Sequence, residues 1–152
     1  MFKLLLLSVA IAVFFIISAL ALAKASQAAE ALTQADALPE CPSSPNCISS
    51  ENNAIAPIAI GNNQSEHLWR LLQQAISQQG GQLVEVRPDY LAATFKTSVF
   101  GFVDDVTARM DLTRNVIHLR SASRVGYYDF GVNRKRLLKL KLRLQNLGND
   151  HE

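Results

Sequence analysis

The chain has 152 residues, a formal net charge of +2 at pH 7 and only two cysteines. Once an N-terminal segment is set aside, this length is enough for one domain with one modest core, and it excludes a large multidomain protein. No catalytic motif with a defined reaction is present, so the sequence does not name a reaction.

Residues 1–25 have the composition of a targeting segment. Lys3 precedes an uncharged run from Leu4 to Ala23, and small residues follow it. The run lies between the core of a secretory signal, about 7 to 15 residues, and a spanning helix of roughly 20. We therefore expect either a cleaved signal peptide or an N-terminal membrane-anchor helix. Residues 26–38 would be a linker, and the domain would lie outside the cytoplasm, periplasmic or anchored to the inner membrane.

Charge is segregated along the exported part. Residues 109–143 carry ten basic and two acidic residues, a local net charge of +8, whereas residues 26–108 carry three basic and nine acidic residues. The two halves can fold against each other and compensate, or the basic half can meet an anionic partner such as lipid head groups. Export argues against nucleic acid as that partner.

The two cysteines, Cys41 and Cys47, flank a short loop that Pro42 and Pro45 stiffen. In an oxidising compartment such a pair predicts a disulfide. A zinc site would need further ligands, and no histidine stands at the short spacing from a cysteine that such sites show. We expect no metal or cofactor.

The domain is expected over residues 39–148, with a tail over 149–152. Residues 41–63 hold proline, serine and asparagine, and they predict an extended, mostly irregular arm. Ser65 is a candidate N-cap for a helix whose apolar residues recur at helical spacing until Gly80 and Gly81 end it.

Beyond residue 81 the apolar period changes from 3.6 to 2 and predicts four strands. They cover residues 83–86, 90–97, 103–113 and 116–121. In the third strand the apolar residues alternate with polar ones, which indicates one face on a core and one in water. The links are short enough for hairpins, so an antiparallel meander is the economical topology.

Within residues 133–147, residues 138–144 alternate leucine with lysine or arginine, yet the composition of the segment favours a basic amphipathic helix. Leu137, Leu140, Leu144 and Leu147 fall on one helical face, and Gly148 is a candidate stop. The predicted fold is thus α+β: a four-stranded antiparallel meander with an N-terminal helix and this C-terminal helix packed on one face, preceded by the signal or anchor helix.

Residues 120–134 concentrate cations, hydroxyls, glycines and aromatic rings where the last strand joins the last helix. The adjacent Asp104 and Asp105 point to opposite faces of their strand, so an arginine of the next strand can lock one of them, or the arginines can stay free for an anion near the helix N-terminus. The candidate polar site, for a ligand or a structural lock, comprises Asp104, Asp105, Arg120, Ser121, Ser123, Arg124, Asp129, Asn133 and Arg134.

Ordinary roles compete with a site at several of these positions. Asp129 and Asn133 are candidate caps of the last helix. Tyr127, Tyr128 and Phe130 either line a pocket or plug the loop onto the core, and we expect the plug. A serine nucleophile at 121 or 123 would need a base, but the nearby His118 lies on the other strand face, so we assign no catalytic residue.

Three segments together resemble the domain-of-unknown-function family numbered 1499. They are Cys-Pro-Ser-Ser-Pro-Asn-Cys-Ile-Ser-Ser at 41–50, Phe-Gly-Phe-Val-Asp-Asp-Val at 100–106 and the stretch at 120–134. The resemblance spans roughly residues 38–147. It implies a bacterial envelope protein, with relatives in photosynthetic organelles, and it implies no chemistry.

We therefore expect an exported or membrane-tethered envelope protein with a noncatalytic binding or assembly role. The alternative is a small-anion-binding protein or an uncharacterised enzyme centred on Arg120, Arg124 and Arg134. Expected partners are the membrane, through the N-terminal segment, and an anionic lipid or small anion.

Overall fold

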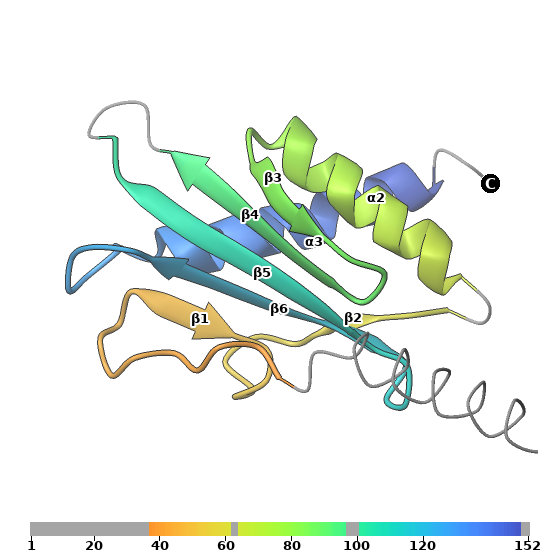
Figure 1. Cartoon of the computed structure of the whole chain (residues 1–152), viewed down its shortest axis with the longest axis horizontal. Coiled ribbons are helices and arrows are strands. Elements are labelled where there is room, and N and C mark those ends of the chain that lie inside the picture. The colour runs from red at the N-terminus through yellow and green to blue at the C-terminus, as the bar shows by residue number, and fades with distance from the viewer. Residues whose placement is uncertain (1–36, 62–63, 97–100, 150–152) are drawn as a thin grey trace, which may run out of the picture. The chain divides into compact units, whose positions relative to one another are not determined.

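The computed structural model describes residues 37–61, 64–96 and 101–149. Within these ranges a single antiparallel sheet has the strand order β1-β6-β5-β4-β3, and β2 also pairs with β6 (Figure 1). The elements in chain order are β1 (Cys47–Ser49), β2 (Ile58–Ala59), α2 (Ser65–Gln78), β3 (Gln82–Val86), β4 (Tyr90–Lys96), β5 (Val103–Asp111), β6 (Val116–Ser123) and α3 (Val132–Asn149).

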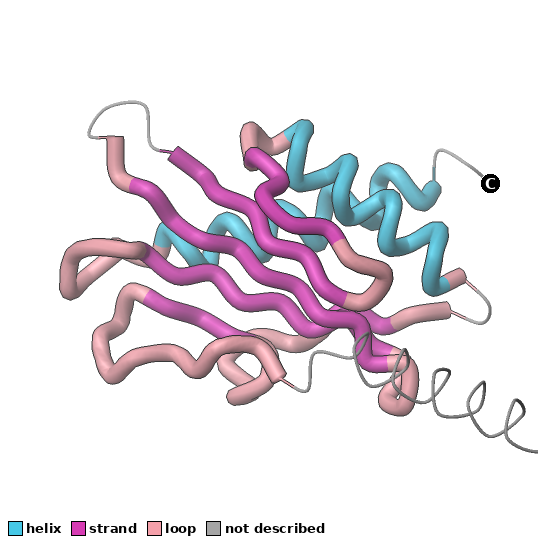
Figure 2. The backbone as a smooth tube through the Cα atoms, in the orientation of Figure 1, coloured by secondary structure: helices cyan, strands magenta, loops and turns pink. Residues whose placement is uncertain are grey.

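Two helices cover one face of the sheet (Figure 2). The α+β class, the antiparallel meander from β3 to β6 and both helices agree with the sequence prediction. The alternating residues of the central strands meet the leucine stripe of α3 and the apolar face of α2 in one core. Its most buried side chains are Leu72, Ile76, Leu91, Val106, Ile117, Leu119, Leu137 and Leu140.

The predicted strand count of four was too low, because the arm supplies two more strands. β1 pairs with β6 in the register Cys47↔Ala122 and Ser49↔Arg120, and β2 pairs through Ile58↔Ile117. These strands are three and two residues long, too short for an alternating pattern to show in the sequence. Pairing with β6, rather than local propensity, makes them strands.

The second half of β5, on the face turned away from the helices, is not in water, contrary to expectation. Thr107, Arg109 and Asp111 are all buried. Glu51, from the arm, forms an ion pair with Arg109 at 2.8 Å between Oε1 and Nη2. These three polar residues therefore belong to the interior, whereas the side chain of Asp105 at the start of the strand stays partly exposed.

The end of α2 agrees with the sequence prediction, whereas the start of α2 and the end of α3 differ from it. Ser65 is the first residue of α2 rather than its cap, and Gln64 at the cap position makes no side-chain capping bond. Gly80 has φ +87°, and the N–H of Gly81 donates to the Ile76 carbonyl at 2.9 Å, so the glycine pair ends α2 as predicted. Gly148 does not stop α3, which continues to Asn149.

The expected signal or anchor over residues 1–25 and most of the linker lie outside the described residues. In the part that the structure does describe, none of the helices has the length and apolar character needed to cross a bilayer.

The predicted disulfide is present between Cys41 and Cys47, whose Cα atoms are 5.5 Å apart. It closes the loop that leads into β1 and indicates an oxidising compartment. The loop lies beside the end of β6, because the Asn46 side chain donates to the Gly126 carbonyl. The disulfide therefore stabilises the place where the arm meets the sheet.

Replacing both cysteines by serine should lower the free energy of unfolding by about 2 kcal/mol, the loop-closure entropy for a loop of this length. Urea unfolding of the variant measures this loss. Reduction of the native protein should have the same effect, whereas an unchanged midpoint in both cases would show that the arm docks without its crosslink.

Candidate functional site

Strand geometry divides the polar stretch at 120–134 between two sides of the sheet. Alternation along β6 directs Ser121 and Ser123 to the helix side, and Arg120 to the other side. Arg124 follows β6, and its side chain binds Asp105 on that same far side. Arg134 belongs to α3, so the three arginines do not converge on one ligand.

Asp105 and Arg124 form a two-pronged ion pair. Nε of Arg124 lies 3.1 and 3.0 Å from the two carboxylate oxygens, and Nη2 lies 2.8 Å from Oδ1. The carboxylate raises the pKa of Arg124, through its hydrogen bond first and its charge second. Both side chains are exposed, so this pair neutralises two charges without locking the core.

Arg120 is half-buried and is held differently. Its Nη2 donates to the Glu40 carbonyl at 3.3 Å, while Nε is buried with no hydrogen-bond partner within the described ranges. Burial lowers the pKa of Arg120, and the charge of Asp105 partly opposes that effect. Arg120 thus attaches the start of the arm to β6.

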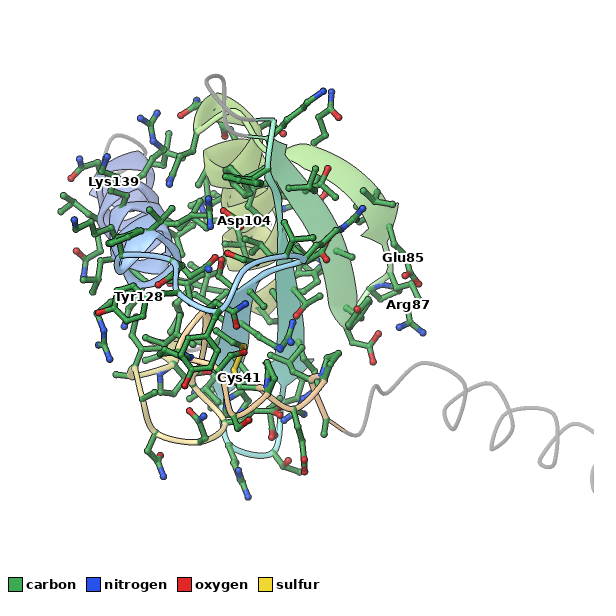
Figure 3. All side chains as sticks on the ribbon, turned by 90° about the vertical axis from the view of Figure 1, so that its left-hand side faces the viewer. Cys41, Glu85, Arg87, Asp104, Tyr128 and Lys139 are labelled. Atoms are coloured by element: carbon green, nitrogen blue, oxygen red, sulfur yellow. A yellow bond between two sulfur atoms is a disulfide. The ribbon has the colours of Figure 1, made fainter. Side chains whose placement is uncertain are left out.

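Asp104 points to the helix side and is buried against Arg136 of α3 (Figure 3). Nη2 of Arg136 lies 2.5 Å from Oδ2 of Asp104, and the guanidinium sits 4.9 Å from the centre of the Phe95 ring. A buried carboxylate in this surrounding is stable only with its cation in place. This pair is the structural lock, and its arginine was not among the predicted residues.

Asn133 extends the lock into a hydrogen-bonded network. Its Oδ1 accepts from Ser121 Oγ at 2.6 Å and from Arg136 Nη1 at 2.6 Å. Its Nδ2 donates to the Asn46 carbonyl at 2.9 Å and to Ser123 Oγ at 3.0 Å. The predicted capping role of Asn133 is therefore wrong, because its side chain turns into the core and joins α3, β6 and the arm.

Asp129 is the residue that caps α3. Its two carboxylate oxygens accept from the backbone N–H groups of Gly131 and Asn133, each at 2.9 Å. Burial opposes ionisation of Asp129, but these hydrogen bonds outweigh it and lower the pKa of the carboxyl group. These two amide groups are thereby occupied and do not attract an anion.

The aromatic residues of the β6–α3 loop do not plug the core, contrary to expectation. Tyr127, Tyr128 and Phe130 are 74%, 59% and 80% exposed. The rings of Tyr128 and Phe130 meet edge to face, with centroids 5.2 Å apart. We call residues 124–131 with these three rings the aromatic loop. It is a projecting apolar surface.

A small groove of about 260 Å³ runs between the aromatic loop and the disulfide loop. Residues of both loops and the start of α3 line it, including Pro45, Tyr128, Asp129 and Arg134. Arg134 is the one cation of the predicted trio that borders this groove.

A second buried polar cluster lies where the arm crosses the far face of the sheet. Oγ of Ser50 is 3.1 Å from Nδ1 of His118, and Nε2 of His118 is 3.9 Å from Oδ2 of Asp111. Asp111 also lies 3.4 Å from Arg109, which in turn binds Glu51. All but Glu51 are buried.

A serine hydroxyl bonded to a histidine is the arrangement that activates a nucleophile, but here the fold occupies it. Ser50 is 2% exposed, and its Oγ accepts the backbone N–H of Leu119 at 2.9 Å. The hydroxyl thus fastens the arm to β6. In the described residues no group of three or more histidine, cysteine or acidic side chains could hold a metal ion.

The two ionisable groups of this cluster have shifted pKa values. Burial lowers the pKa of His118, and the positive charge of Arg109 adds to that effect, so the ring is neutral at pH 7. The hydrogen bond from Thr113 is the largest cause that lowers the pKa of Asp111, which falls from 3.8 to about 2 despite burial.

Some of these missed residues had a signal in the sequence. Asn133 and Arg136 each lie four residues before Leu137 and Leu140, so the leucine stripe of the predicted helix already placed both on its buried face. Ser50 and Glu51 had no such signal, because their positions depend on the pairing of a three-residue strand.

A model of the family described as "Protein of unknown function (DUF1499)" matches residues 37–144. The match covers nearly all of the part that the structure describes and confirms the resemblance inferred from the three segments. No curated protein sequence matches the chain.

Replacing Arg136 by alanine should cost about 3–5 kcal/mol of unfolding free energy, because Asp104 is left buried and unpaired. Arg124→Ala is the matched control and should stay close to the wild-type value, since its pair with Asp105 is exposed. Denaturant unfolding compares them. The double variant Asp104→Leu/Arg136→Met should lose less than Arg136→Ala, and an equal loss would contradict the lock.

Stability should fall in two steps as the pH is lowered. Below pH 6.5 the unfolded chain takes up a proton at His118 that the folded protein disfavours. From pH 3.8 to about 2 the contribution of ionised Asp111 is lost as well. Urea unfolding at several pH values should show the first step removed in His118→Gln and the second in Asp111→Asn. His67→Gln, at an exposed position of α2, should keep both.

Proposed function

Because the chain belongs to the DUF1499 family, whose function is unknown, its role must come from its surface, and we propose a noncatalytic binding role. The domain is an exported or membrane-tethered envelope protein that contacts its partner through the aromatic loop. The observation that carries this proposal is Phe130, which is 80% exposed with a backbone φ of +55°.

That conformation is costly for a residue with a large side chain. The left-handed region costs an L-residue roughly 1–2 kcal/mol, and strained positions of this kind gather at functional sites. Gly126 and Gly131 also have positive φ, but they adopt it without a Cβ penalty. In return the isolated domain gains only the contact of the Phe130 ring with the exposed ring of Tyr128.

The loop is nevertheless held in place at both ends. Asn46 donates to the Gly126 carbonyl, and Asp129 binds the amides of Gly131 and Asn133. The frame behind the loop is the buried network around Asn133. A preorganised apolar projection loses less conformational entropy on binding than a disordered one would.

Two observations support the proposed location in the cell envelope. The disulfide suits an oxidising compartment, and the apolar run from Leu4 to Ala23 suits export or anchoring. The family resemblance to envelope proteins agrees with both.

A second candidate is a small-anion site in the groove beside Arg134, which is favoured by the position of that cation on its wall. Such a site would use neither Arg120 nor Arg124. The groove is smaller than the range of about 300–1,000 Å³ usual for ligand pockets, and Asp129 adds negative charge to it. The aromatic loop therefore remains the leading surface.

Nitration of tyrosines tests whether the loop is occupied in the envelope. In intact spheroplasts Tyr127 and Tyr128 should react several-fold more slowly than in the detergent-purified chain, because a bound partner covers their exposed rings. Tyr90, on the other face of the sheet, is the internal reference. Mass spectrometry reads all three, and equal reactivity of the loop tyrosines in both states would reject the proposal.

Phe130→Gly separates binding from folding. Glycine accepts the positive φ, so the unfolding free energy should not fall, while the protection of Tyr127 and Tyr128 in spheroplasts should weaken. A large loss of stability in this variant would instead give the ring a structural role.

A further inference from the structure

We propose that the occupant of the aromatic loop is the anionic surface of a phospholipid bilayer, which the loop and the outer face of α3 contact together. This inference rests on the proposed function and names its partner. The loop supplies rings that insert at the level of the head groups, and the helix supplies cations that bind their phosphates.

The loop has the composition of an interfacial contact. Tyrosine carries an apolar ring and a polar hydroxyl, which suit the boundary between acyl chains and water, and phenylalanine adds apolar area. Two aliphatic residues, Val125 at 58% exposure and Val132 at 41%, flank the three rings. Five exposed apolar side chains thus fall within the eight residues 125–132.

The outer face of α3 continues this surface with positive charge. Val132, Lys135, Lys139 and Leu142 recur at i, i+3, i+7 and i+10 on the side opposite the buried leucines. Leu142 and Leu138 are exposed as well. We call this stripe with Leu138 the basic face of α3. Leucines between lysines are typical of helices that lie on anionic membranes.

The loop and the basic face point to the same side of the molecule. In Figure 3 Lys139 lies on the outer side of α3 and Tyr128 lies below that helix on the same side of the picture, whereas Glu85 and Arg87 lie on the opposite side. One approach to a flat surface can therefore engage the ring and the lysine together.

The cations on this side are available. Residues 132–149 carry six basic and no acidic side chains. Three of the six already have partners. Arg136 forms its ion pair with Asp104, Lys141 donates to the Ala56 carbonyl, and Arg143 donates to Oε1 of Gln78. Within the described part of the chain, the side chains of Arg134, Lys135 and Lys139 have no hydrogen bond or ion pair. Each such charge near an anionic leaflet contributes about 1 kcal/mol.

The N-terminal segment would bring the loop within reach of a bilayer. Residues 24–36 separate the apolar run from the described domain and span at most about 45 Å when fully extended. A domain of this size has a radius of gyration of roughly 13 Å. The linker is therefore long enough for the domain to turn, and the contacts of the domain surface with the bilayer determine its orientation.

A second copy of the chain fits this surface less well. Two-fold pairing would bring Arg134, Lys135 and Lys139 against their own equivalents, and like charges repel. A lipid leaflet supplies the opposite charge over a wide area and needs no complementary pocket, which suits a projecting loop.

Phe130→Trp in the full-length chain reports on insertion of the loop. In vesicles that contain phosphatidylglycerol, fluorescence from position 130 should be quenched by lipids brominated in their acyl chains. Leu112→Trp is the matched control, because Leu112 is 64% exposed at the opposite end of β6 and should not be quenched. Trp69 is buried and gives the same background in both variants.

Neutralising cations should weaken the contact. In the Phe130→Trp chain, replacing Arg134, Lys135 and Lys139 by glutamine should each lower the ratio of inserted to free loop about fivefold. Three results would overturn the inference: quenching no stronger than in the Leu112 control, equal quenching in phosphatidylcholine vesicles, or a dimer that shields position 130 in detergent. If the tyrosines are protected in spheroplasts but no quenching occurs, the binding role stands and its partner is not lipid.

Discussion

The buried ion pair between Asp104 and Arg136 is the interaction on which the domain depends, because within the described residues it is the one polar link between the central strand β5 and α3. Arg136 also reaches Asn133 and Ser121, and Asn133 holds the Asn46 carbonyl. The Arg136 guanidinium thus connects β5, β6 and α3 directly, and it reaches the arm through Asn133. The buried carboxylates Asp104 and Asp111 each lie beside an arginine, which explains how a core of modest size tolerates them.

The ion pairs in the interior determine which charged side chains remain without a partner on the surface. The inner arginines and acids neutralise one another, and Asp129 is committed to the start of α3. In the described structure Arg134, Lys135 and Lys139 are without an acidic partner, and all three lie on α3, which follows the loop that carries the most exposed aromatic rings of the domain.

Helices and strands with a strong hydrophobic periodicity could be predicted from the sequence. Strands that form only because they pair with a neighbouring strand could not. The leucine stripe gave α3, and the alternating residues of β4 to β6 gave the meander, because side-chain period follows backbone geometry. β1 and β2 are strands only because β6 lies beside them. The same limit applies to the candidate site: the lock needed Arg136, whose helical spacing was readable, whereas the cluster of Ser50 and His118 needed the unpredicted pairing of the arm.

The pairing of the arm with β6 also fixes an order of events during synthesis and export. Asn46 leaves the ribosome long before Gly126, its partner 80 residues later, so the arm has nothing to pair with until the last strand arrives. The disulfide spans only six residues and can close long before that. The arm can therefore pair with the sheet only after β6 has been synthesised and has folded. In a molecule truncated before β6, the arm stays unpaired.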